Sequence, residues 1–155
     1  MIWFNINDLE QQISTNRLSE KNGFNYLLAS TIYGFIYMLY ATMSTFTYLT
    51  LIDTGIAIVI TIIFFPIIYK INASIDNKDF IKRFIAIGWV VRMKLLIYTL
   101  VFMFLYFNFF DPSSPSITQN VILSVFSIAM NLLFYVLIIN SFKRLKPINI
   151  NTDKI

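Results

Sequence analysis

The chain has 155 residues, of which 57% are hydrophobic, 17% aromatic and only 13% charged, and its formal net charge is +4. Soluble domains carry about 25% charged residues, so this composition excludes an ordinary water-soluble domain and indicates an integral membrane protein of one domain. Because the chain has no Cys and no His, disulfides, thiol-ligated zinc, cysteine nucleophiles and histidine bases are also excluded.

The first 23 residues place apolar side chains at roughly helical spacing, with polar residues between them. Gly23 is suited to break this first helix before the longer apolar runs begin. We expect an amphipathic helix on the inner leaflet of the membrane, anchored at the surface by Trp3 and Phe4. Docking of this segment on a cytosolic protein is the alternative.

Four apolar runs are long enough to cross a hydrocarbon core of about 30 Å, which needs about 20 helical residues. They lie near 26–47, 54–69, 84–110 and 117–142. The second run is short, with about 26 Å of helix between Asp53 and Lys70, and this predicts local thinning of the bilayer or snorkelling. The predicted fold is therefore all-α, with four transmembrane helices in two hairpins over residues 24–143.

Basic residues fall in the connections and terminal segments on one side of the membrane. The connections around Asp53 and Asp111 carry no Lys or Arg, whereas the N-terminal segment, the connection between spans two and three, and the C-terminal end with its tail 144–155 carry ten. These ten are Arg17, Lys21, Lys70, Lys78, Lys82, Arg83, Lys143, Arg144, Lys146 and Lys154. By the positive-inside rule both termini lie in the cytoplasm, and in a bacterium the chain lies in the inner membrane.

Local signals mark the expected helix starts. Ser116 and Gln119 form an S-x-x-Q capping box at the start of the fourth span. Asp53 is suited to cap the second span, and Asn7 or Asp8 to cap the N-terminal helix. We expect these side chains to satisfy backbone N–H groups that have no partner within the helix.

Two cations, Arg92 and Lys94, interrupt the third span. All eight acidic residues lie outside the spans, so no intramembrane carboxylate can pair with these cations. The 19 residues from Arg92 to Asp111 form about 28 Å of helix, which is one hydrocarbon thickness. We therefore expect lipid to begin near Arg92, with both cations snorkelling to the headgroups. The alternative is a polar cavity in which either cation serves as an anion site or a gating charge.

If the third span begins at Arg92, residues 77–91 extend this helix into the cytoplasm with a charged side and an apolar side. Together with the basic C-terminal residues they predict a face for a protein partner or lipid headgroups. This face comprises Lys78, Phe80, Lys82, Arg83, Phe84, Trp89, Arg92, Lys94, Lys143, Arg144 and Lys146. The apolar side would lie in the headgroup region, on a neighbouring subunit or against a soluble partner.

Polar side chains form a seam on the first span and another on the fourth, with steps of three and four residues that match the coiled-coil period. The members are Tyr33, Tyr37, Tyr40 and Ser44 on the first span, and Asn120, Ser124, Ser127 and Asn131 on the fourth. We expect the seams to pack these spans together or to join copies in a homo-oligomer. The alternative is a polar pore shared by several copies.

The sequence holds no G-x-S-x-G, P-loop or glycine-rich dinucleotide motif and no pair of intramembrane carboxylates. We therefore interpret the chain as a non-enzymatic membrane protein without cofactor, metal or nucleic-acid partner. It would contact lipid, form a homo-oligomer, and sense or recruit a cytosolic protein through its basic face. A membrane subunit of a bacterial defence or immunity system fits this description. The alternative is an oligomeric ion-conducting effector that depolarises the membrane.

Overall fold

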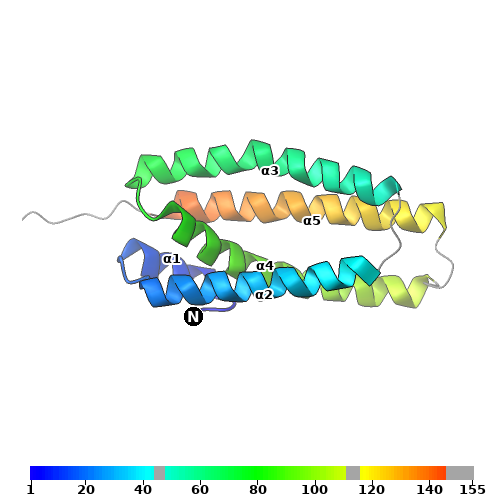
Figure 1. Ribbon diagram of the computed structural model, residues 1–155, viewed down its shortest axis with the longest axis horizontal. Helices are drawn as coiled ribbons and strands as arrows, with labels where there is room; N and C mark the ends of the chain where they lie inside the picture. The colour runs from blue at the N-terminus through cyan, green and yellow to red at the C-terminus, as the bar shows by residue number, and fades with distance from the viewer. Residues whose placement is uncertain (44–47, 111–115, 146–155) are drawn as a thin grey trace, which may run out of the picture.

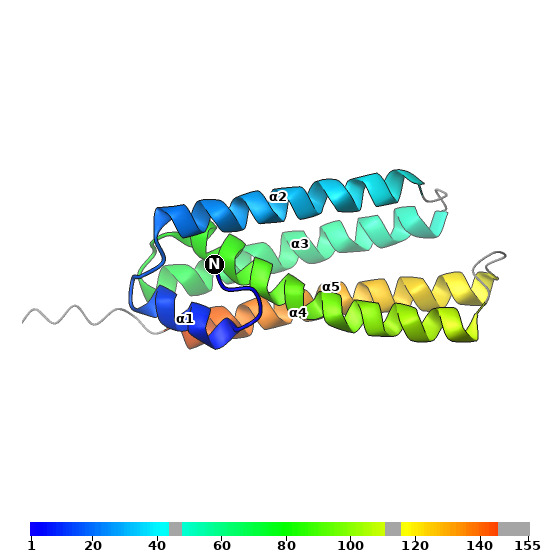
Figure 2. The same cartoon turned by 90° about the horizontal axis from the view of Figure 1, so that it is seen from below.

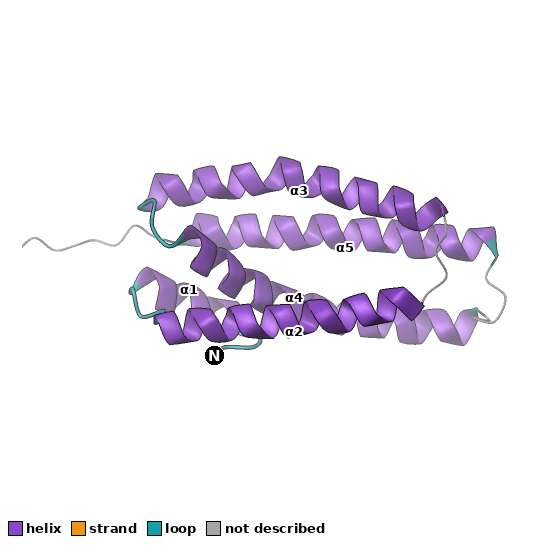
Figure 3. Cartoon of the chain, in the orientation of Figure 1, coloured by secondary structure: helices purple, strands orange, loops and turns teal. Residues whose placement is uncertain are grey.

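The computed structural model describes the backbone of residues 1–43, 48–110 and 116–145, and the side chains of these residues except 37–43 and 49. The described part forms five helices joined by short loops (Figures 1 and 3). They are α1 (Ile6–Ser14), α2 (Glu20–Met43), α3 (Tyr48–Ile75), α4 (Phe80–Phe109) and α5 (Ile117–Arg144). The predicted all-helical class is confirmed.

Within the described residues, three helices are long and apolar enough to cross a membrane by length and composition, namely α4, α5, and α3 from Thr50 to Ile75. The chain is therefore a multi-pass membrane protein with three candidate spans. The predicted second span, near 54–69, is the middle of α3, whose 28 residues extend over about 42 Å and need no thinning of the bilayer. The predicted first span, near 26–47, begins in α2 and ends outside the described residues.

The four long helices run side by side, and α1 lies at one end of the molecule (Figures 1 and 2). The main packed pairs of long helices are α3 with α5, α2 with α4, and α4 with α5. α4 crosses the bundle, because Phe80 in its first turn contacts Tyr69 of α3 and Phe142 of α5, whereas Trp89 lies against Tyr33 of α2. α2 and α3, which were predicted to form a hairpin, therefore pack mainly on other helices.

The hydrophobic core is concentrated at the end of the molecule that we call the basic end, formed by residues 1–30, 68–91 and 135–145. Its largest fully buried apolar side chains come from all five helices and are Tyr26, Phe142, Leu9, Ile68, Ile87, Ile138, Val90 and Val91. The apolar side of α1 packs on α4 and α5. Since burying a Leu or Ile contributes roughly 1.5–3 kcal/mol relative to water, this side holds α1 on the protein.

Away from the basic end, the helices expose large apolar side chains. Ile62 of α3, Phe104 and Phe109 of α4, and Val125 of α5 are between 61% and 79% exposed. Such exposure is unfavourable in water and suits a hydrocarbon surrounding. α4 is the best covered of the three candidate spans. In its most apolar stretch 28% of the residues are buried, compared with 11% in the corresponding stretches of α3 and α5. α4 is therefore the central helix.

The helix caps agree with the sequence at one site and differ at another. The capping box is present, because Ser116 Oγ accepts from the Gln119 backbone N–H at 3.3 Å and Gln119 Oε1 accepts from the Ser116 N–H at 2.5 Å. The cap of α1 is Asn5, whose Oδ1 accepts from the N–H groups of Asn7 and Asp8. The prediction of Asn7 or Asp8 as the cap was wrong, because α1 already begins at Ile6 and both residues lie inside its first turn.

Candidate functional site at the basic end

Most of the residues predicted to form a partner face lie at the basic end, Arg92 and Lys94 lie just beyond it along α4, and their environments differ. Lys78, Lys143 and Arg144 are exposed, and Phe80, Lys82, Phe84, Arg92 and Lys94 are partly buried. Arg83 and Trp89 are no more than 5% exposed, so these two lie inside the chain and are not part of an exposed face. Lys146 lies outside the described residues.

Arg83 closes the turn between α3 and α4. Its guanidinium donates to both carboxylate oxygens of Asp76, at 2.7 and 2.6 Å, and to Asn72 Oδ1 at 3.1 Å. Asn72 is fully buried and its amide donates to the Lys78 carbonyl. Bidentate pairing of this kind gives both strength and fixed geometry. Arg83 therefore positions the start of α4, a role that the sequence pattern did not indicate.

The same turn contains two strained backbone positions and a perturbed carboxyl group. Asn77 and Asp79 have φ values of 53° and 50°, in the left-handed region that Asn and Asp tolerate better than most residues. The hydrogen bonds from Arg83 hold the pKa of Asp76 below its ordinary value, and the Lys78 backbone N–H and the nearby cationic charges act in the same direction against partial burial. Asp76 therefore stays ionised under acid conditions that would protonate a free Asp.

Glu10 attaches α1 to the end of α5. It is 8% exposed, and its Oε1 accepts from Ser141 Oγ at 2.5 Å and from Arg144 Nη2 and Nε at 2.7 and 3.2 Å. A buried carboxylate needs this degree of pairing to offset its loss of hydration. Arg144, predicted as a partner residue, therefore serves α1 within the same chain.

Lys82 joins α4 to the start of α2. Its Nζ lies 2.6 Å from Glu20 Oε1 and 3.2 Å from Asp79 Oδ2. Gly23 lies inside α2, not at a helix break as predicted, and a Cβ there would come within 2.9 Å of Lys82 Cγ. The absence of a side chain at Gly23 therefore lets the lysine stem pass closely over α2 to reach Glu20.

Phe80 and Phe84 belong to an aromatic cluster that holds α3, α4 and α5 together. The rings of Phe80 and Phe84 lie 5.4 and 5.1 Å from that of Phe65, and Phe80 also contacts Tyr69 at 5.2 Å and Phe142 at 6.2 Å. Edge-to-face pairs at these separations add about 0.5–1.5 kcal/mol beyond the buried area. Phe80 and Phe84 therefore pack against other helices of the same chain, whereas the sequence analysis placed them on a face for a protein partner or lipid headgroups.

Arg92 lies between two aromatic rings. Its guanidinium carbon is 5.4 Å from the Tyr33 ring and 5.5 Å from the Phe134 ring, and no carboxylate of the described residues forms a salt bridge with it or with Lys94. Cation–π contacts of this kind contribute about 0.5–1 kcal/mol at exposed sites and about 2 kcal/mol when desolvated. The aromatic rings therefore stabilise Arg92 where the sequence offers no acid.

Trp3 and Trp89 pack edge to face, with ring centroids 5.4 Å apart. Trp89 is buried, and its indole N–H has no hydrogen-bond partner among the described residues. Trp3 and Phe4 are 48% and 52% exposed. The N-terminal residues therefore rest on α4 while leaving half of both ring systems available, and their role as a membrane anchor stays a prediction.

One member of the polar seam of α5, Ser124, contacts α3, and so does Tyr135 of the same helix. Ser124 donates a short hydrogen bond to Asp53, which lies inside α3 rather than capping it, and Tyr135 donates to Thr61 Oγ1 at 2.8 Å. Asn120 and Asn131 are partly buried and Ser127 is exposed. On α2, Tyr33 contacts Trp89 and Arg92. The side chains of Tyr37 and Tyr40, and all of Ser44, lie outside the described residues.

Five exposed cations at the basic end form no salt bridge within the described part of the chain. We call them the open cations, and they are Arg17, Lys21, Lys70, Lys78 and Lys143. By contrast, Lys82, Arg83 and Arg144 are each paired with a carboxylate. The basic end therefore carries two kinds of cation. Some are paired with carboxylates and connect parts of the fold, and the open cations are exposed on the surface.

No protein-family model, curated protein or solved structure matches the chain. Among the described residues, no group of three or more Asp and Glu side chains is placed to hold a metal ion. The interpretation of the site therefore rests on its own geometry and charge.

Proposed function

We propose that this chain is a non-enzymatic, multi-pass inner-membrane protein that forms oligomers and recruits or senses a cytosolic protein through its basic end. The observation that carries the proposal is the separation of cations at that end. Lys82, Arg83 and Arg144 join helices to one another, whereas the open cations are exposed on a packed core. A rigid array of surface charge is suited to recognition.

In this proposal α2 is a fourth span and both termini lie in the cytoplasm. The connection between α2 and α3, residues 44–47, and that between α4 and α5, residues 110–116, contain no Lys or Arg. The basic end carries all the open cations, and a bias of this size in short loops favours a cytoplasmic location under the positive-inside rule.

The chemistry of the open cations favours a partner with an acidic surface. Each exposed ion pair contributes only about 0–1 kcal/mol, so five such cations supply orientation and a faster encounter more than affinity. Their effect weakens when salt shortens the Debye length below about 10 Å. Recruitment should therefore be strongest at low ionic strength.

Self-association is supported by a polar side chain on the outer surface of α5. Ser127 is exposed on α5 among apolar neighbours. Small hydroxylated residues let helices approach closely in lipid, and a hydrogen bond between helices adds about 0.6 kcal/mol on average. This surface of α5 is the one that we assign to contact between copies.

The test is site-specific photo-crosslinking in cells, with a photoreactive residue at Lys78 or at Lys143. We expect both probes to capture the same cytosolic protein. A probe at Phe104, which is 70% exposed on the apolar part of α4, serves as the matched control and should not capture it. Changing the other open cations to Glu should abolish capture, whereas changing them to Arg should preserve it.

Two results would overturn the proposal. One is crosslinking at positions 78 and 143 to lipid alone, with no change on charge reversal. The other is a selective ion current from the purified chain in planar bilayers, which would assign the ion-conducting function to it instead.

A further inference from the structure

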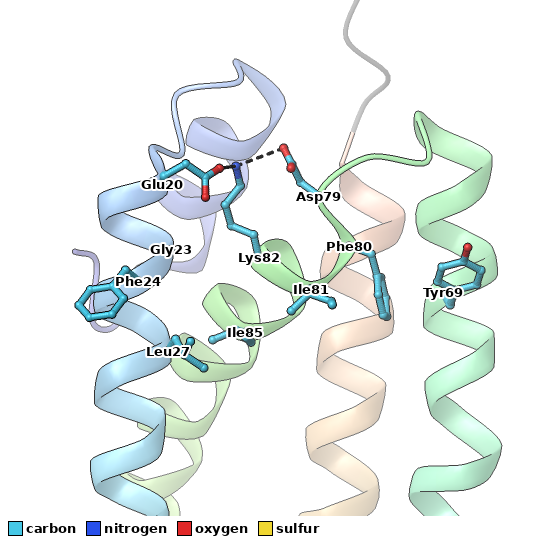
Figure 4. Close-up of a pocket in the computed structure, with 10 residues that line it drawn as sticks. All are labelled: Glu20, Gly23, Phe24, Leu27, Tyr69, Asp79, Phe80, Ile81, Lys82 and Ile85. Carbon is cyan, nitrogen blue, oxygen red and sulfur yellow. Dashed lines mark hydrogen bonds and ion pairs between the residues drawn. The ribbon is translucent and has the colours of Figure 1, made fainter.

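A pocket of about 610 Å³ opens between α2 and α3 at the basic end, over the first turns of α4 (Figure 4). Its apolar wall includes Phe24 and Leu27 of α2, Tyr69 of α3, and Phe80, Ile81 and Ile85 of α4. Sites for small molecules usually enclose about 300–1,000 Å³. The pocket is therefore large enough for a headgroup and the first part of its attached chains.

Polarity changes along the pocket in one direction. Glu20, Lys82 and Asp79 lie together at one end, and Leu27 and Ile85 lie toward the other, further along the same helices (Figure 4). Beyond Leu27 and Ile85, α2 and α4 continue toward the far end of the molecule, where large apolar side chains are exposed. A charged end followed by an apolar wall parallel to the spans matches the order of groups in a membrane phospholipid.

At the charged end Lys82 is paired with two carboxylates. Lys82 is held by Glu20 at 2.6 Å and Asp79 at 3.2 Å, and its side chain is only 17% exposed. The Glu20 and Asp79 side chains are 88% and 42% exposed, so both carboxylates remain accessible to a ligand. The pocket thus presents one ammonium group between two accessible carboxylates.

This arrangement disfavours a simple anion. Two carboxylates outweigh the charge of Lys82, so a lone phosphate or sulfate would meet net repulsion at the pocket mouth. A group that combines a phosphate with a primary ammonium is complementary, because Lys82 can donate to the phosphate while Glu20 and Asp79 accept from the ammonium. A choline group is less suitable, because its quaternary nitrogen has no N–H to donate.

We propose that the pocket binds phosphatidylethanolamine, with the headgroup at Glu20, Lys82 and Asp79 and the acyl chains passing Leu27 and Ile85. The bound lipid fills the space between α2 and α3, which pack mainly on other helices. This inference does not depend on which side of the membrane the basic end faces, nor on recruitment of a protein.

Native mass spectrometry of the purified full-length chain tests the proposal without any substitution. The chain is exchanged in detergent with phosphatidylethanolamine and with its mono-, di- and trimethylated derivatives, which share one phosphate and one set of acyl chains. We expect retention to fall with each methyl group, and to be about tenfold weaker for the trimethylated lipid, which corresponds to about 1.4 kcal/mol. Equal retention across the series would overturn the proposal.

A variant pair locates the bound lipid. Glu20→Gln together with Asp79→Asn should remove the preference for phosphatidylethanolamine in a chain that still unfolds in one cooperative transition, at a lower temperature than the wild type because Lys82 loses both partners. Asp8→Asn, an exposed carboxylate on α1 outside this pocket, is the control and should retain the preference. If the double variant unfolds cooperatively and still prefers phosphatidylethanolamine, the lipid binds elsewhere.

A third variant, Leu27→Trp, fills the apolar part of the pocket. We expect it to lower lipid retention without altering the mass of the oligomer. A change in oligomer mass with unchanged lipid retention would instead identify a second copy of the chain as the occupant, and the proposal would be wrong.

Discussion

The bidentate pair between Arg83 and Asp76 is an ionic contact that sets geometry at the α3–α4 turn. Arg83 is 4% exposed, so its charge must be compensated inside the chain. Asp76 supplies that compensation across a turn that contains two residues with positive φ. The orientation of α4, and with it the position of Lys82 and the pocket, therefore depends on one carboxylate in a loop.

Replacing Asp76 with Asn should lower the free energy of unfolding by about 3–5 kcal/mol, because buried Arg83 loses its counter-charge. The lowered pKa of Asp76 fixes the sign of the pH dependence. Its contribution is fully present above the pKa of a free Asp, about 3.9, and is lost as the pH falls through the lower pKa of the folded chain. Thermal unfolding in detergent across this acid range measures both effects.

The control for this prediction is Asp8→Asn, since Asp8 is exposed and forms no salt bridge among the described residues. It should change stability by less than about 0.5 kcal/mol. The Asp76 variant should also lack the acid-side loss that the wild type shows. An equal effect of the two substitutions would contradict the role of the Arg83 pair.

A second prediction concerns the contacts of Arg92 with aromatic rings. Arg92→Lys should destabilise the chain by about 1 kcal/mol, because a lysine ammonium lacks the planar guanidinium that contacts the rings of Tyr33 and Phe134. Lys94→Arg, two residues away, is the matched control and should have little effect. Thermal unfolding measures stability, and crosslinking from Lys78 measures recruitment. Normal stability with lost recruitment would assign Arg92 to partner binding instead.

At the scale of elements, α1 covers the apolar side of the first half of α4. The sequence predicted a helix in each segment, and the structure confirms both. The sequence analysis left the apolar side of residues 77–91 to lipid, a neighbouring subunit or a soluble partner. In the structure α1, α2 and α5 of the same chain cover much of it, and Ile81 stays 70% exposed beside the pocket. Helical periodicity identifies an apolar face but does not identify what covers it, because that depends on contacts distant in sequence.

Leu9, which is fully buried, should be the residue that holds α1 most strongly. Leu9→Ala should cost about 2–5 kcal/mol and release α1, so that trypsin cleaves faster after exposed Arg17 in the loop that follows. Phe4→Ala changes a residue that is 52% exposed and should leave the rate of cleavage almost unchanged. Equal rates for the two variants would show that packing of Leu9 does not hold α1.

Whether a helix cap could be predicted depended on how far apart in the sequence its hydrogen-bonding partners lie. The capping box of Ser116 and Gln119 was predictable because both partners lie within one turn. The cap at Asp53 was wrong because α3 begins at Tyr48, and the Asp53 carboxylate instead accepts from Ser124 on a helix 71 residues away. No local pattern encodes that contact, nor the buried positions of Arg83 and Trp89.

The two ends of the molecule differ in exposure: the basic end contains the buried core, whereas the rest of the long helices exposes large apolar side chains, as suits lipid. The proposed orientation predicts that a cysteine at Ser113, in the connection between α4 and α5, reacts with an impermeant maleimide added outside the cell. A cysteine at exposed Lys143 should react only after the membrane is opened. Since the chain has no native Cys, each label reports one site. The reverse pattern would contradict the loop-charge argument.

The contact between Glu10 and Ser141 joins residues 131 positions apart. At roughly 5–20 residues per second, synthesis of the intervening chain takes roughly 7–26 s. During this time α1 emerges from the ribosome before the end of α5 that receives Glu10 exists. Attachment of α1 to α5 is therefore a late step in biogenesis. In a chain truncated before Ser141, α1 can already pack on α4, but the carboxylate of Glu10 lacks Ser141 and Arg144. Only the finished chain holds its N-terminal helix at both places.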